Sequence, residues 1–327
     1  MIDSEETSIL FVNEEQRYAQ HLITDPVNLS FDRHAYSRYK YGDTNQAKLF
    51  GQELASGFIE KHREFLLSTT QQFAAISSPR ALIPPAAYYI FQTFIECVNY
   101  FLASHSCLPV IEHTIQRLGT LAEDYSLLSP HERLDHLTHE RYFLDSQPLT
   151  DKFLLFVDDI RITGDKRKIT NISVVFISKM THRFFLLFLG MHEMNIIRLL
   201  ETLHIENPRL FIYYAELVNN HIPSTFEYQL NRCAIENLEQ LLTIIHNQPS
   251  NFRINTRILK EILRSNLTEL KQFLCSINYD LHREIYQACL ACNYQAIEIF
   301  TKSLDYIHCY LKQRENNNNK QEFHLLK

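Results

Sequence analysis

Residues 153–157 form an uninterrupted hydrophobic run, Phe-Leu-Leu-Phe-Val, which constrains the fold more than any other feature of the sequence. Charged residues bound the run on both sides, with Asp151-Lys152 before it and Asp158-Asp159 after it. A strand with one face in water alternates apolar and polar residues, so this run indicates a central strand of a parallel sheet, buried on both faces. Open α/β sheets bind ligands beyond the carboxyl ends of their strands, where the two aspartates would lie.

The segments around this run alternate between helical and strand patterns. A helical pattern follows the turn at Gly42-Asp43-Thr44, and either Asp43 or Thr44 is expected to cap that helix. The alternation indicates an α/β fold with a Rossmann-like parallel sheet over about residues 20–225. The elements expected in it are helix 45–65, strand 73–79, helix 84–102, strand 108–115, strand 153–157, helix 194–203 and strand 210–217.

From about residue 226 the pattern becomes wholly helical and predicts an all-helical domain over residues 226–312, a surface on which a protein partner could dock. Three of its segments begin at an asparagine, with spacings of 29 and 27 residues: Asn237, Asn266 and Asn293. This spacing fits either degenerate paired-helix repeats, similar to ankyrin units, or an ordinary small helical bundle. The polar stretch that follows predicts a disordered tail at residues 313–327.

Composition excludes several classes of protein. The 327-residue chain has six glycines, too few for the clustered glycines of a dinucleotide-binding fingerprint. Its net charge of −6 gives no overall electrostatic reason to bind nucleic acid or an anionic membrane surface. No apolar run approaches the roughly 18 residues of a transmembrane helix, and the acidic N-terminal segment lacks a secretory-signal pattern. Seven scattered cysteines indicate reduced thiols in a cytoplasmic protein.

Two groups of residues of the types that bind metals are better explained as packed or solvated helix faces than as metal sites. Cys289 and Cys292 could form a zinc site with His308 and Cys309, but residues three apart share one helix face, and small thiols pack well there. The second group is a set of histidines in or beside a charged helical stretch: His113, His131, His136 and His139. Alternation of His with Glu and Arg is typical of a solvated helix face.

The segment from Phe153 to Gly164 resembles the signature of type I phosphoribosyltransferases: a hydrophobic strand, two acids, variable residues, then Thr-Gly. The resemblance implies a sheet of that family's kind. It also implies that Asp158 and Asp159 hold the ribose hydroxyls of phosphoribosyl pyrophosphate, directly or through Mg²⁺. The loop at Thr163 and Gly164 would cradle the 5′-phosphate with backbone N–H groups. Carboxylates suit this chemistry because positive charge develops on the ribose as the anomeric bond breaks.

Two earlier stretches support the resemblance. The sequences of residues 36–43 and 76–84 resemble stretches of phosphoribosyltransferase-like proteins from bacterial stress and tellurium-resistance-type gene clusters. Arg38 and Lys40 in the first stretch could equally lie in a solvated turn. In the wider family the loop after the earlier strand meets pyrophosphate, and an Arg there supplies a charged fork for it. The resemblance therefore implies a pyrophosphate-binding role for Ser77, Ser78 and Arg80.

The Thr-Gly loop also departs from the family pattern. Purine-salvage members place an acid directly before Thr-Gly, where this chain has Ile162, which weakens any assignment to hypoxanthine or guanine salvage. Asp165 would repel a phosphate. The three cations that follow it, Lys166, Arg167 and Lys168, would attract a phosphate. Arg161 and Lys166 are candidate substrate-binding residues.

Residues 165–190 separate this loop from the helix expected to carry it. The segment contains two short apolar runs and ends in Phe184-Phe-Leu-Leu-Phe-Leu-Gly190. Without it, Thr163-Gly164 would lead directly into the helix beyond Met191, the arrangement that a phosphate site needs. We therefore hypothesise that the segment is either a lineage-specific insertion or untranslated sequence read through in the gene model.

The resemblance implies a Mg²⁺-dependent transfer of phosphoribose from phosphoribosyl pyrophosphate to an unidentified acceptor, with Asp158 and Asp159 at the metal and the ribose. The alternative is a non-catalytic sensor or interaction protein that binds a phosphoribosyl ligand or nucleotide with the same fold and a protein partner with its helical domain. A third reading is a component of a multi-enzyme cluster that supports stress tolerance. The acceptor has no recognisable sequence signature in this chain.

Overall fold

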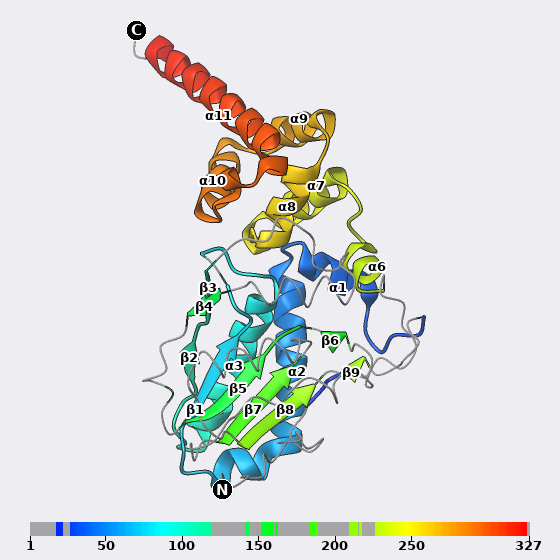
Figure 1. The fold of residues 1–327 in the computed structure, drawn as a ribbon, viewed down its shortest axis with the longest axis vertical. Helices are drawn as coiled ribbons and strands as arrows, with labels where there is room; N and C mark the ends of the chain where they lie inside the picture. The colour runs from blue at the N-terminus through cyan, green and yellow to red at the C-terminus, as the bar shows by residue number, and fades with distance from the viewer. Residues whose placement is uncertain are drawn as a thin grey trace, which may run out of the picture.

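The structure is a computed structural model of the 327-residue chain. It describes residues 18–21, 27–80, 82–118, 141–143, 149, 152–159, 161–162, 183–188, 209–214, 216–217 and 226–325. A sheet with helices packed against it forms one part of the molecule, and a group of helices from the last third of the chain forms the other (Figure 1). The α/β plus helical arrangement expected from the sequence is therefore present.

The main sheet has five parallel strands in the order β2-β1-β5-β7-β8. Its strands are β1 (Phe73–Ser77), β2 (Ile111–His113), β5 (Phe153–Val157), β7 (Arg183–Phe188) and β8 (Arg209–Tyr214). The prediction of a central strand at 153–157 is confirmed, because β5 lies third in this order. The strand predicted at 108–115 is shorter than expected, and that at 210–217 is divided between β8 and a separate strand, β9 (Glu216–Leu217). Two small sheets accompany it, pairing β3 (Gln116–Leu118) with β4 (Arg141–Phe143), and β6 (Arg161–Ile162) with β9 (Glu216–Leu217).

Strand β7 comes from the segment 165–190. It pairs in parallel with β5 on one side and β8 on the other. A chain that lacked residues 165–190 would therefore lose the strand that lies between β5 and β8. The insertion hypothesis stays a prediction, since residues 165–182 and 189–190 lie outside the described residues, as does the helix predicted at 194–203.

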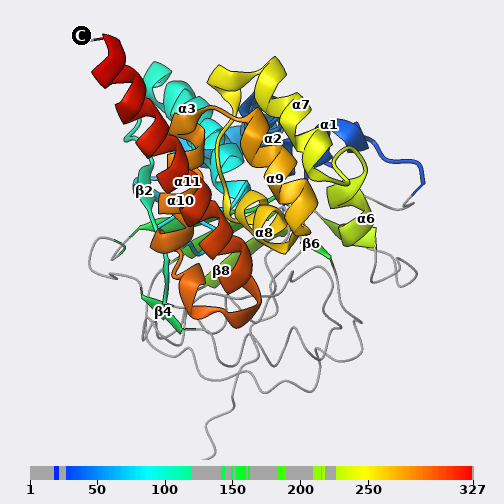
Figure 2. The ribbon, with the colours of Figure 1, turned by 90° about the horizontal axis from the view of Figure 1, so that it is seen from above.

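Helices α1 (Arg33–Lys40), α2 (Thr44–Ser68) and α3 (Ala87–Ser104) precede or follow the first strand. The predicted cap of α2 is confirmed, because the Asp43 side chain accepts hydrogen bonds from the N–H groups of Asn45 and Gln46. α2 and α3 lie together on one face of the sheet (Figures 1 and 2). Phe58 and Phe94 from these helices meet the buried faces of β1 and β5 in a single hydrophobic core.

The helical part contains α6 (Phe226–Arg232), α7 (Leu238–Asn247), α8 (Thr256–Arg264), α9 (Leu267–Ser276), α10 (Tyr279–Ala291) and α11 (Glu298–Leu325). Asparagine side chains cap the first turns of four of these helices: Asn237, Asn255, Asn266 and Asn278. The third asparagine of the predicted repeat, Asn293, differs, because it has a left-handed backbone with φ of 56°. α7 contacts α9, and α8 contacts α10. Both repeats and a bundle allow such contacts, so the choice between them stays a prediction.

The last helix differs from the sequence expectation. α11 continues to Leu325, whereas a disordered tail was expected from residue 313. The physical reason lies in what the segment lacks: residues 298–325 contain no glycine or proline that would end a helix, and Lys, Gln, Glu and Leu favour helix on either side of the asparagines. Figure 1 shows α11 projecting away from the other helices.

The two parts of the molecule meet at the turn between α1 and α2. Gly42 has φ of +91°, and a Cβ atom there would lie 2.5 Å from the Arg253 carbonyl oxygen, so glycine is required both by conformation and by space. The Arg253 N–H donates to the Gly42 carbonyl, and Asp43 forms an antiparallel bridge with Phe252. The segment that precedes α8 is thereby fixed against the end of α1.

Candidate functional site

The acidic pair lies at the carboxyl end of β5, beside the carboxyl end of β1. The parallel register pairs Ser77 with Val157, so the residues that follow each strand are neighbours. Ser78 Oγ donates a hydrogen bond of 2.5 Å to Asp158 Oδ1, and the Asp159 N–H donates one of 2.9 Å to the same oxygen. The structure therefore brings together four of the predicted site residues: Ser77, Ser78, Asp158 and Asp159.

Burial has a marked effect on the first aspartate. Asp158 and Asp159 are 9% and 6% exposed, respectively. Burial, followed by the charge of Asp159, raises the pKa of Asp158 to about 7, against the lowering effect of the Ser78 hydrogen bond. A carboxyl group with such a pKa changes its protonation state near neutral pH, as is frequent among groups in functional sites.

The second aspartate is paired with the C-terminal turn of α1. Lys40 Nζ forms a short ion pair with Asp159 Oδ2. The Tyr39 hydroxyl donates to the same oxygen at 2.8 Å, and the Tyr36 hydroxyl approaches it at 3.5 Å. All three donors belong to buried residues. The alternative that Lys40 lies in a solvated turn is therefore wrong: its ammonium group has been withdrawn from water to neutralise a buried carboxylate.

Sequence reasoning missed Tyr36, Tyr39 and Lys40 as site residues, although a signal for them existed. The three residues have the spacing i, i+3 and i+4, which places them on one face of a helix. The Asp32 side chain caps this helix by accepting from the His34 N–H. Burial, and next the charge of Asp159, raises the pKa of Tyr39 well above its ordinary value, so this hydroxyl stays a hydrogen-bond donor.

Contacts from the helical part hold α1 in this position. Ser37 Oγ donates to the Asn231 carbonyl at 2.7 Å and accepts from the Ala234 N–H at 3.1 Å. Asn255 Nδ2 donates to the Lys40 carbonyl at 3.2 Å. Lys40 is thus bound at its backbone by the cap of α8 and at its side chain by the acid that follows β5.

Arg80 lies apart from these contacts. Its guanidinium group stacks over the Tyr88 ring at 3.9 Å and approaches Thr114 Oγ1 at 3.4 Å. Arg161 begins strand β6, but its side chain lies outside the described part of the structure. Thr163, Gly164 and Lys166 also lie outside the described residues. The expected roles of Arg80 and of the phosphate loop stay predictions.

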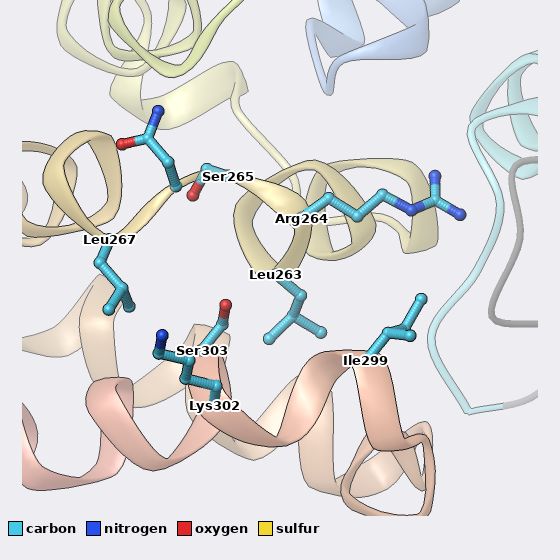
Figure 3. A pocket seen from close by; sticks show the side chains of 8 residues that line it. Leu263, Arg264, Ser265, Leu267, Ile299, Lys302 and Ser303 are labelled. Carbon is cyan, nitrogen blue, oxygen red and sulfur yellow. The ribbon is translucent and has the colours of Figure 1, made fainter.

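A hollow lies between α8, α9 and α11 (Figure 3), and neither Asp158 nor Asp159 lines it. It has a volume of about 540 Å³, and Leu263, Leu267 and Ile299 form an apolar part of its lining. Two cationic side chains, Arg264 and Lys302, also line it, whereas no carboxylate does. The hollow therefore lacks the two carboxylates of the sequence motif and is not the site that the motif predicts.

The cysteine pair considered as a zinc site lies inside the helical core. Cys289 and Cys292 are both buried there. Burial raises the pKa of the Cys289 thiol to about 12, which disfavours the thiolate that would bind a metal or react. Within the described residues, no three His, Cys, Asp or Glu side chains gather in a way that could hold a metal ion. His131, His136 and His139 lie outside those residues.

A parallel sheet with two acids after its central strand is the arrangement that the resemblance to phosphoribosyltransferases implies. A family model described as PRTase ComF-like matches residues 15–189 and 186–307, which together span most of the chain. The chain therefore belongs to the PRTase ComF-like family. The two matched ranges overlap over residues 186–189, and the first three of these residues belong to β7. No curated protein and no solved structure matched the chain. Among the described residues, no helix combines the length and apolar character needed to span a membrane.

Proposed function

We propose that this phosphoribosyltransferase-like protein transfers phosphoribose from phosphoribosyl pyrophosphate to an acceptor. The observation that carries the proposal is the junction of Ser78 and Asp158 at the carboxyl ends of two adjacent parallel strands, the edge where open α/β sheets bind ligands. Membership of the PRTase ComF-like family supports it.

In the proposed reaction the bond between ribose C1 and the pyrophosphate oxygen breaks, and the leaving pyrophosphate keeps the bonding electron pair. An acceptor nucleophile bonds to C1 from the opposite face and loses its proton to solvent, so the configuration inverts. The carboxylate of Asp158 stabilises the positive charge that develops on the ribose in the transition state. Ser78 holds that carboxylate by its 2.5 Å hydrogen bond. Ser77, Ser78 and Arg80 would bind the pyrophosphate, and the loop at Thr163 and Gly164 the 5′-phosphate.

The acidic pair also fits Mg²⁺. Mg²⁺ prefers oxygen ligands and is usually held by one or two carboxylates together with water and substrate phosphates. Within the described part of the chain, both hydrogen bonds accepted by Asp158 end on Oδ1, which leaves Oδ2 for such a ligand. Bound there, Mg²⁺ would neutralise charge on the leaving pyrophosphate. Asp158 is thus the residue best suited to hold it, with Asp159 adjacent.

The proposal also includes a setting for the protein. We propose that it acts in the cytoplasm and takes part in a stress response, as the resemblance to proteins of bacterial stress gene clusters implies. All seven cysteines are free thiols, which is the usual state in a reducing compartment.

Calorimetry with phosphoribosyl pyrophosphate and Mg²⁺ tests the proposal. The wild-type protein is expected to bind, and Asp158→Asn, which removes one charge with little change of shape, is expected to weaken binding at least about tenfold. Asp305→Asn is the matched control, because Asp305 is exposed on α11. A wild-type protein that shows no binding contradicts the proposal.

Pyrophosphate release, measured with a panel of nucleophilic acceptors, then separates transfer from binding alone. Release that depends on the acceptor and is lost in Asp158→Asn supports transfer. Binding without release for any acceptor in the panel favours instead the non-catalytic sensor, which would bind the same ligand and keep its protein partner in the Asp158→Asn variant.

A further inference from the structure

The two adjacent aspartates differ in how their charges are balanced within the protein. Asp159 Oδ2 accepts from Lys40 Nζ, from the Tyr39 hydroxyl and, at longer range, from the Tyr36 hydroxyl. An ionised carboxylate oxygen offers about two lone pairs, so these donors already occupy Oδ2, and the ammonium group of Lys40 balances the negative charge of the carboxylate as a whole. Asp158, in contrast, accepts only neutral donors among the described residues, Ser78 Oγ and the Asp159 N–H.

The environment of Lys40 shows that this pairing is built into the fold. Lys40 is only 9% exposed, and its ammonium group lies 5.6 Å from the centre of the Tyr36 ring and 5.8 Å from that of Tyr39. Aromatic faces at such distances stabilise a cation. Withdrawing an ammonium group from water is costly unless an anion compensates it, and Asp159 is that anion. A ligand that took Asp159 from Lys40 would leave a buried cation unpaired.

The Asp159 backbone connects this ion pair to the neighbouring carboxylate. Its N–H donates to Asp158 Oδ1 at 2.9 Å, so the conformation of Asp159 sets the orientation of the Asp158 side chain. Lys40 is in turn held through its carbonyl by Asn255 Nδ2. A continuous set of contacts therefore runs from α8 through α1 to the carboxylate that faces Ser78.

We propose that Asp159 is a positioning residue, fixed by Lys40 of α1, and that Asp158 is the member of the acidic pair that contacts the phosphoribosyl ligand. This inference rests on the proposed function. It gives the two aspartates different roles, whereas the resemblance implies that both hold the ribose and the metal. In this arrangement α1 completes the site from a distant part of the chain by neutralising one acid and leaving the other available.

A double-mutant cycle with Lys40→Met and Asp159→Asn tests the pairing. Each single variant leaves one buried charge without its partner, so each should lower the midpoint of urea unfolding. The double variant removes both charges and should lose less stability than the sum of the two single losses. Lys48→Met, at an exposed position of α2, is the matched control and should have little effect. Additive losses would overturn the inference.

Calorimetry with phosphoribosyl pyrophosphate and Mg²⁺ tests the positioning role on the same variants, at a temperature where each is folded. Asp159→Asn should weaken binding about tenfold, and the double variant should recover to within about threefold of the wild type. A purely structural role would leave the affinity of folded Asp159→Asn unchanged, and this result overturns the inference. So does a stable double variant whose affinity stays as low as that of Asp159→Asn, because Asp159 would then contact the ligand. A wild type without affinity overturns the proposed function itself.

Discussion

Polar side chains are buried both at the carboxyl end of β5 and in the helical part, but their partners lie at very different distances along the chain. Lys40 and Asp159, which neutralise each other, are 119 positions apart. Asn255, buried at the start of α8, accepts from the N–H groups of Arg257 and Ile258, two and three residues further on. The charges at the site are therefore balanced by the packing of distant segments, whereas the asparagine caps of the helical part satisfy first-turn N–H groups locally, over an apolar core.

The largest expected effect belongs to the apolar core of the helical part. Phe300 is fully buried there, so Phe300→Ala should lower the free energy of unfolding by about 3–5 kcal/mol. Its neighbour Ile299 is 63% exposed, and Ile299→Ala is the matched control, with an expected loss below about 1 kcal/mol. Urea denaturation measures both. Equal losses for the two variants would show that the helical part is not stabilised by this core.

At the acidic pair, the expected effect is smaller, because the substitution Tyr39→Phe removes a single hydrogen bond. Tyr39→Phe leaves the ring in place and deletes the 2.8 Å bond to Asp159, so we expect a loss of about 2 kcal/mol, typical of a hydrogen bond to a buried charged group. Tyr100→Phe is the control, since Tyr100 is 82% exposed. A Tyr39→Phe variant as stable as the control would mean that Lys40 alone suffices to hold Asp159.

The same contrast explains what could be predicted from the sequence. The helix that Asp43 caps and the central strand at 153–157 follow from local patterns, and both are confirmed. Ser78 and Asp158 were each identified from a resemblance, and the parallel pairing of β1 with β5 brings them into contact.

The remainder of the site could not be derived in this way. A lysine among tyrosines reads locally as a surface residue, and only the packing of α1 against the end of β5 reveals that Lys40 is buried. The sequence did not predict β7 for a related reason. Its apolar run stands where the motif implies a loop that leads directly into a helix, and only the pairing with β5 and β8 shows that the run is a strand of the sheet.

The pH dependence of stability distinguishes the two aspartates further. The pKa of Asp158 rises from 3.8 in the unfolded chain to about 7 in the folded protein, so the folded state binds more protons between these values. Stability should therefore fall as the pH rises from about 4 to about 7. Asp158→Asn keeps the side-chain oxygen that accepts from Ser78 and lacks this charge.

We expect Asp158→Asn to be more stable than the wild type at pH 8 by at least about 1.4 kcal/mol, the free energy that corresponds to a single unit of the raised pKa. The difference should shrink as the pH falls towards 4. Chemical denaturation at pH 5 and pH 8 measures it, with Asp305→Asn as the control. A variant less stable than the wild type at pH 8 would show that the Asp158 charge is compensated in the folded protein.

The smallest expected effects come from the asparagine caps, and they measure how far the two regions are coupled. Asn255 and Asn266 each accept from two N–H groups at the start of a helix, so Asn266→Ala should cost about 1 kcal/mol by loss of the cap alone. Asn255 also donates to the Lys40 carbonyl, so Asn255→Ala should cost about 1 kcal/mol more. The excess over Asn266→Ala isolates the contact with α1. Only Asn255→Ala should also weaken phosphoribosyl pyrophosphate binding, and equal affinities in the two variants would show that the helical part does not act on the site through Lys40.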